Sequence, residues 1–94
     1  MLSDVPKNLD GLSPSQKDME ILRWGIMAEF DAINLYEQLA AKASDENIKK
    51  VLFDIAREEK THVGEFEAML LRLDGEQVGE NEKAKEEVNE IISE

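Results

Sequence analysis

The sequence predicts an all-α fold: an antiparallel two-helix hairpin, followed by a short C-terminal helix, that pairs with a second copy into a four-helix bundle. Two observations support this prediction. Long stretches repeat apolar residues at the three- and four-residue spacing of helices, and each stretch begins at a residue that caps helices well. A chain of 94 residues makes one small domain with a limited core. The apolar faces of a single hairpin therefore need a second chain to cover them.

The composition narrows the classes of function. The chain carries 22 acidic residues against 11 basic ones, a formal net charge of −11. Acidity alone indicates solubility, but it also repels nucleic acid and concentrates cations. The absence of cysteine excludes disulfides, iron–sulfur clusters and thiol nucleophiles. No signal peptide and no apolar run of about 20 residues is visible, so we expect a cytoplasmic protein without a membrane partner.

The N-terminal half is interpreted as a loose leader followed by one long helix. Residues 1–12 contain Pro and Gly without helical periodicity, and we expect them to be flexible. Ser13 caps the first helix, with Pro14 at its first position and Gln16 at its third, as in a capping box. The first helix is predicted over 13–43.

A second helix is predicted over 44–74, because Asp45 and the acidic residue after it form a helix start. The turn before it is short, so the two helices must pack antiparallel. A connector is expected at 75–81, followed by a short C-terminal helix over 81–93. The few apolar positions of that last helix indicate that it docks on another surface. All of these elements belong to one domain, 1–94.

Two glutamates and the single histidine interrupt the apolar faces of the long helices. Glu29 stands in the middle of the apolar stripe of the first helix, and Glu59 and His62 stand in that of the second. A buried charge is costly unless it is paired or bound to metal. In carboxylate-bridged di-iron bundles two helices each supply Glu-x-x-His and two others each supply a lone Glu. One hairpin holds half of this set, so we expect one centre of two iron ions per pair of chains. Glu65, by contrast, is assigned to a polar face.

The ligand types also indicate the metal and the reaction. A ligand set with more carboxylates than imidazoles suits Fe(II) or Mn(II), whereas structural zinc sites prefer thiolate and imidazole ligands. Two irons together pass electrons to O2 or peroxide, which predicts a ferroxidase that oxidises Fe(II) to Fe(III). Tyr36 lies two turns after Glu29 on the same face. It is either a hydrogen-bonding or redox-active neighbour of the centre or an ordinary core tyrosine.

Two segments carry a family resemblance, AEFDAINLYEQLA (28–40) and REEKTHVGEFEAML (57–70). Their signature is a Glu, a Tyr two turns later, a short turn and then EExxH. With this signature, the region from Ile21 to Leu73 resembles the encapsulated ferritins, two-helix ferritin-like proteins carried inside encapsulin nanocompartments.

The resemblance implies that Glu29, Glu59 and His62 are iron ligands and that Tyr36 lies beside the centre. It also implies a ferroxidase centre at a dimer interface within a ring-shaped decamer, an encapsulin shell as partner, and iron storage and detoxification inside the nanocompartment. Family members carry a C-terminal targeting extension or are fused to the shell. No clear targeting tag is visible in residues 75–94.

The family also places acidic residues around the lone Glu as a metal-attraction site. Asp31 matches one of these positions, whereas Ala28 departs from the other. Leu35 replaces the family's aromatic residue before the tyrosine. These departures predict altered surroundings for the centre.

Two alternatives to a ferroxidase stay open. The first is a non-enzymatic dimerisation or cargo module, in which the Glu–His cluster fixes the register of the helices. The second is a rubrerythrin-like peroxidase. It would need an external electron donor, because the chain has no cysteines for a rubredoxin-type iron centre.

Overall fold

The structure, a computed structural model, describes residues 9–93 and consists of three helices in that range: α1 (Pro14–Lys42), α2 (Glu46–Leu73) and α3 (Gly75–Ile92). No strand occurs among the described residues. The predicted all-α fold is confirmed. Most of the expected leader, residues 1–8, lies outside the described range.

The start of α1 is fixed by reciprocal hydrogen bonds. The backbone N–H of Gln16 donates to the Ser13 hydroxyl at 3.2 Å, and the N–H of Ser13 donates to the Gln16 side-chain oxygen at 3.0 Å. This is the capping box that the sequence predicts, with Pro14 at the first helical position. It satisfies backbone donors that have no partner inside the helix.

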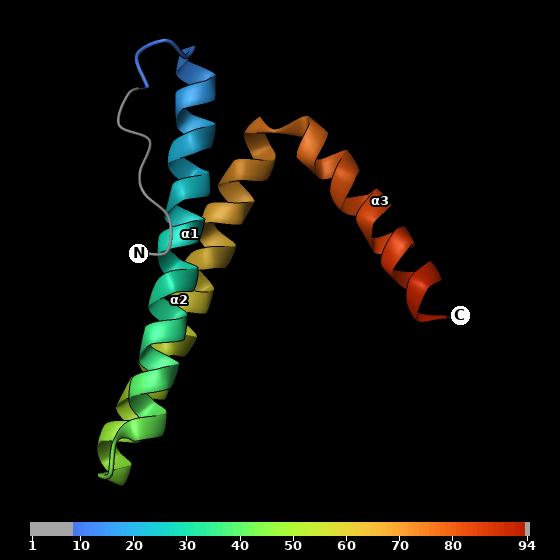
Figure 1. Ribbon diagram of the computed structural model, residues 1–94. Coiled ribbons are helices and arrows are strands. Elements are labelled where there is room, and N and C mark those ends of the chain that lie inside the picture. Colours follow the sequence, from blue (N-terminus) through green and yellow to red (C-terminus); the bar gives the residue numbers. More distant parts are fainter. Residues whose placement is uncertain (1–8, 94) are drawn as a thin grey trace.

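A short turn brings α2 back along α1 in the opposite direction (Figure 1). Asp45 begins α2, and its carboxylate accepts hydrogen bonds from the backbone N–H groups of Asn47 and Ile48 at 2.7 and 3.0 Å. The two helices pack along their length around a narrow apolar core. The buried core residues are Ile33, Ala40, Ala56, Val63 and Leu70.

Close packing in the middle of the hairpin depends on Gly25. A Cβ at this position would lie 3.1 Å from the ring of Phe66, closer than side chains normally approach. The missing side chain therefore makes room for an aromatic ring between the helices. This contact lies one helical turn from Glu29.

The third helix differs from the sequence expectation, because α3 begins at Gly75 instead of 81. The predicted connector at 75–81 is helical, and Asp74 alone separates α2 from α3. Asp74 caps the new helix by accepting a hydrogen bond from the backbone N–H of Gln77 at 3.1 Å. Glycine weakens a helix by only about 1 kcal/mol per residue, so a good cap offsets much of that cost.

The third helix leaves the hairpin at an angle and points away from it (Figure 1). Its backbone approaches α2 near the bend and does not approach α1. Among the described residues, an ion pair between Arg23 and Asp74 at 3.0 Å ties the bend to α1. None of the three helices is long and apolar enough to cross a membrane.

Candidate metal centre

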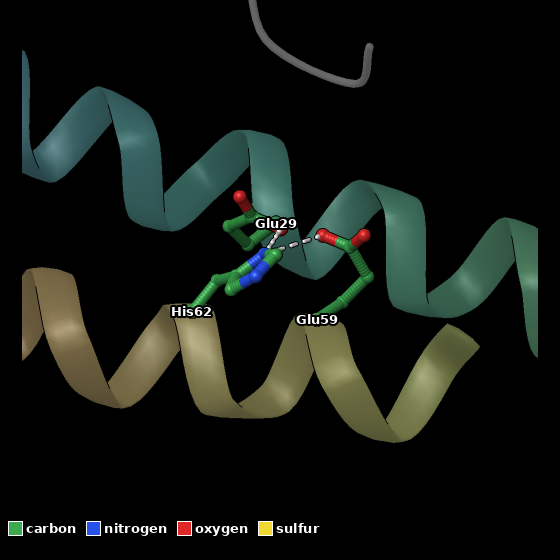
Figure 2. A group of neighbouring side chains, drawn as sticks. All are labelled: Glu29, Glu59 and His62. Carbon is green, nitrogen blue, oxygen red and sulfur yellow. Dashed lines mark hydrogen bonds and ion pairs between the residues drawn. The ribbon is translucent and has the colours of Figure 1, made fainter. Parts of the chain in front are cut away.

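Glu29 on α1 and the pair Glu59 and His62 on α2 point toward one another across the hairpin (Figure 2). They meet because α1 and α2 run antiparallel and because three residues nearly complete one helical turn. One donor atom from each residue lies within 4.8 Å of the other two. This is the single cluster of metal-ligating side chains found in residues 9–93.

The imidazole nitrogen Nδ1 of His62 lies between the two carboxylates. It is 3.4 Å from Oε2 of Glu59 and 3.5 Å from Oε2 of Glu29. A protonated Nδ1 can donate to these oxygens, and a deprotonated Nδ1 can join them as a metal ligand. The three side chains therefore offer a cation two negative oxygens and one neutral nitrogen at a single point.

The burial of the trio is uneven. The carboxylate side chains are each 19% exposed, whereas that of His62 is 47% exposed. Partly buried carboxylates favour a bound cation, because water no longer screens their charge fully. The exposed side of His62 shows that the cluster opens onto a surface of the hairpin and is not enclosed within it.

That surface, here called the metal face, is apolar around the trio. It follows the side of α1 and α2 on which Glu29, Glu59 and His62 lie. Its well-exposed apolar residues are Ile21, Leu39, Ile48, Val51, Met69 and Leu73. Large exposed apolar surfaces mark sites of association in soluble proteins.

The donor set fits iron but supplies only part of a coordination sphere. Oxygen-rich ligands with one imidazole match Fe(II), which commonly takes more ligands than the three donors present. The His62 nitrogen lies 3.4 and 3.5 Å from the two carboxylate oxygens, about the spacing of neighbouring ligands around one metal ion. The remaining ligands must come from water, from substrate or from a second chain.

Two further residues of the sequence prediction lie outside this cluster. Tyr36 is partly buried on α1, two turns from Glu29 on the metal face. Asp31 lies in a different hollow, on the outer side of α1, together with Ala28, Ala32 and Leu35. The structure does not bring Asp31 together with the three candidate ligands.

One neighbour of the cluster was missed by sequence reasoning. A hollow of about 340 Å³ is lined by Glu29, His62, Glu65 and Phe66. Glu65 had been assigned to a polar face, although it follows His62 by three residues and so lies on the adjoining turn. The three-residue spacing from His62 to Glu65 was therefore the sequence signal that a third carboxylate lies beside the hollow.

Comparison with known proteins identifies the family. The Rubrerythrin family model matches residues 20–93. The chain belongs to the rubrerythrin family. It also superimposes on the crystal structure of the encapsulated ferritin domain from Pyrococcus furiosus with a TM-score of 0.83 and 52% sequence identity, covering 100% of this chain and 98% of that one. The resemblance to encapsulated ferritins predicted from the sequence is confirmed.

Two curated relatives are longer than this chain. It is 56% identical over 93 residues to a "Ferritin-like-encapsulin shell fusion protein" of Pyrococcus furiosus, a match that covers 97% of this chain and 27% of the relative. It is 36% identical over 72 residues to the "Encapsulin nanocompartment cargo protein EncC" of Myxococcus xanthus, covering 77% of this chain and 55% of the relative. The chain thus spans about a quarter and about half of the length of these relatives.

Proposed function

We propose that two copies of this chain form a ferroxidase centre between them and oxidise Fe(II) to Fe(III). The convergence of Glu29, Glu59 and His62 on an open apolar face supports this proposal. Each chain contributes half of the ligand set of a carboxylate-bridged di-iron bundle. Pairing the metal faces of two chains completes the set and covers the apolar residues in one step.

The residues of the trio have separate tasks in this reaction. Glu29 and Glu59 bring negative charge that attracts ferrous ions and stabilises the higher charge of the ferric product. His62 supplies a neutral nitrogen donor at the same point. Two ferrous ions that lose one electron each deliver two electrons. With two protons these reduce O2 to hydrogen peroxide, or they reduce peroxide to water.

Tyr36 and Asp31 take supporting roles in the proposal. Tyr36 lies on the metal face two turns from Glu29, where pairing of two chains brings it beside the centre. Asp31, in its separate hollow on the outer side of α1, is assigned to the attraction of metal ions. The net charge of −11 acts in the same direction.

The names of the relatives support a partner and a location. One relative is fused to an encapsulin shell protein, and the other is an encapsulin cargo protein. We therefore infer that this chain works with an encapsulin shell inside a cytoplasmic nanocompartment and feeds an iron store there. Assembly of the pairs into a ring-shaped decamer is part of the same proposal.

Substitution of the ligands tests the chemistry. His62→Ala and Glu59→Gln are expected to slow Fe(II) oxidation by roughly 100-fold or more, since loss of even a group that supports a metal ligand costs 10- to 100-fold. The rise of ferric absorbance under air, or after addition of peroxide, measures the rate. Glu58→Gln is the matched control, because Glu58 is exposed and lies outside the trio. Unchanged oxidation by His62→Ala would refute the proposal and leave a structural Glu–His cluster.

A second variant tests whether the centre lies between chains. Val51 is exposed on the metal face, two turns from Glu59, and belongs to no ligand set. Val51→Asp places a charge in the pairing surface, so oxidation and Fe(II)-dependent association are expected to fall together. Gln38→Asp, at an exposed position of α1 on the opposite side, is the control. Full activity of Val51→Asp in a monomeric sample would show that one chain suffices.

A further inference from the structure

The ring of His62 has two nitrogens, and only one of them faces the carboxylates of the candidate centre. Nδ1 lies 3.4 Å from Glu59 and 3.5 Å from Glu29 (Figure 2). Within residues 9–93, Nε2 takes part in no hydrogen bond or ion pair. In a neutral imidazole one nitrogen carries a hydrogen and the other a lone pair. Nδ1 can therefore bind a cation beside the two carboxylates only in the tautomer whose hydrogen is on Nε2.

The N–H group at Nε2 then needs an acceptor. A histidine that binds metal through one nitrogen almost always donates the N–H of the other to a carboxylate, a backbone carbonyl or water. That hydrogen bond fixes the tautomer and the orientation of the ring. The backbone carbonyls around His62 already accept hydrogen bonds within α2. A side chain or water beside the ring must therefore be the acceptor.

The hollow beside the centre contains one side chain that suits this task. Its lining consists of Glu29, His62, Glu65 and Phe66. The ring of Phe66 has no oxygen, and Oε2 of Glu29 already faces Nδ1. The carboxylate of Glu65 is the remaining acceptor in the lining.

Helical geometry brings Glu65 within reach of the imidazole. Glu65 follows His62 by three residues, which places their Cβ atoms about 5–6 Å apart on one side of α2. Side chains on a helix lean toward its N-terminus, so Glu65 extends back over the turn that carries His62. The ring of His62 leans in the same direction, because its Nδ1 contacts Glu59 on the preceding turn. The nitrogen that does not face Glu59 is left for Glu65.

Glu65 is free to make this hydrogen bond and does not belong to the ligand set. In the described part of the chain it is exposed and takes part in no hydrogen bond or ion pair. Other exposed carboxylates of the hairpin have basic partners: Glu37 pairs with Lys60, and Asp54 pairs with Arg57. Glu65 also lies outside the trio whose donor atoms come within 4.8 Å of one another, although it shares a hollow with two of them.

We propose that Glu65 accepts a hydrogen bond from Nε2–H of His62 and thereby presents Nδ1 as the metal-binding nitrogen. This inference deepens the proposed function and rests on it, since the metal is the one that the trio binds there. Glu65 is a positioning residue, because it acts on the metal through the imidazole. Its negative charge also makes the imidazole a stronger donor to the metal. Pairing of two metal faces removes water from this hydrogen bond and strengthens it.

The tautomer can be measured directly, because the chain has a single histidine. With histidine labelled by nitrogen-15, proton–nitrogen correlation spectra contain the signals of one imidazole. Zn(II) serves as a diamagnetic probe that is not oxidised. In the wild-type chain we expect Zn(II) on Nδ1 and a protected hydrogen on Nε2. In Glu65→Leu the Nε2–H signal should be lost by exchange with water. A signal as well protected in Glu65→Leu as in the wild type would overturn the proposal.

The affinity for Mn(II) separates orientation of the ring from simple attraction by charge. Mn(II) suits the same ligand types as Fe(II), and the signal of the free ion in electron paramagnetic resonance measures binding. Glu65→Leu is expected to weaken binding about 10- to 100-fold, the usual cost of losing such a partner. Glu65→Gln keeps an oxygen that accepts from Nε2–H, so its affinity should lie between those of the wild type and Glu65→Leu. Equal losses in the two variants would indicate an effect of charge alone and overturn the proposal.

Glu67→Gln is the matched control for these variants. Glu67 carries the same charge on the same helix and is exposed. It lies two residues after Glu65, on the other side of α2, beside a different hollow that contains Ile26 and Leu70. Its substitution should leave the affinity for Mn(II) and the Nε2–H signal unchanged. A loss of affinity as large as that of Glu65→Gln would show that the position of the carboxylate does not matter and would overturn the proposal.

The same titration distinguishes failure of this inference from failure of the proposed function. His62→Ala and Glu59→Gln should abolish Mn(II) binding at the centre. Wild-type binding by both variants would refute the centre itself, and the role of Glu65 with it. Loss of binding in these variants, together with wild-type affinity in Glu65→Leu, would refute only the role of Glu65 and leave the ferroxidase proposal in place.

Discussion

The two junctions of this chain differ by two residues and produce opposite results. Three non-helical residues separate α1 from α2, and the helices fold back on each other and share a core. One residue, Asp74, separates α2 from α3, and α3 leaves the hairpin with Val78, Val88, Ile91 and Ile92 exposed in the part of the chain that the structure describes. At both junctions the carboxylate of an aspartate caps the helix that follows. The longer linker thus accompanies antiparallel packing, and the one-residue linker accompanies a helix that diverges from the hairpin.

Truncation of apolar side chains should give the largest difference between the hairpin and α3 in the free energy of unfolding that is lost. Leu70 is buried between α1 and α2, so Leu70→Ala is expected to lower the free energy of unfolding by about 2–4 kcal/mol. Ile91 is exposed in the single chain, so Ile91→Ala should cost less than about 0.5 kcal/mol in dilute samples. Urea unfolding followed by circular dichroism measures both. Equal losses at low concentration would mean that α3 is covered within its own chain.

Removal of the aspartate caps should give a smaller difference between the two junctions in the stability that is lost. Asp45→Ala loses one cap and is expected to cost about 1 kcal/mol. Asp74→Ala also loses the ion pair with Arg23 and should cost about 1–2 kcal/mol. Arg23→Met, which keeps the cap, isolates the ion pair. A greater loss for Asp45→Ala than for Asp74→Ala would contradict the central role of the bend.

Replacement of glycine by alanine should give the smallest difference in stability between a site in α3 and a site in the hairpin. A Cβ at Gly79 in α3 meets no atom within 4 Å, so Gly79→Ala should stabilise that helix by about 0.5–1 kcal/mol. The same gain at Gly25 is offset, because the new methyl group presses on the ring of Phe66 at 3.1 Å. Helicity and urea unfolding compare the two variants. A larger gain at Gly25 than at Gly79 would show that the ring moves freely.

Helical spacing and capping residues were enough to predict the hairpin. Ser13 and Gln16 defined the start of α1, and the short turn determined the antiparallel packing that brings Glu29 opposite His62. The bend was harder to predict. Gly75 and Gly79 suggested a connector, but the Asp74 cap compensates for their weak helix propensity and the helix continues almost at once.

The surroundings of the candidate centre were only partly predictable. The trio follows from interruptions in two apolar stripes, which are visible in the sequence. Helical periodicity contains the places of Glu65 and Asp31: Glu65 follows His62 by three residues and shares its side of α2, whereas Asp31 follows Glu29 by two residues and lies on another side of α1. The hollow that Glu65 lines with Glu29 and Phe66 depends on how α1 packs against α2, and periodicity along one helix does not contain it.

The half-exposed His62 has a kinetic consequence. If two chains share each centre, the number of working centres in a dilute solution rises with the square of the chain concentration. Activity per chain should then fall on dilution and recover when Fe(II) is added in excess, because a metal ion that binds the pair more tightly than the single chain favours pairing. The rate of Fe(II) oxidation would rise steeply with the concentration of the protein. A few isolated chains would leave the surrounding iron unchanged.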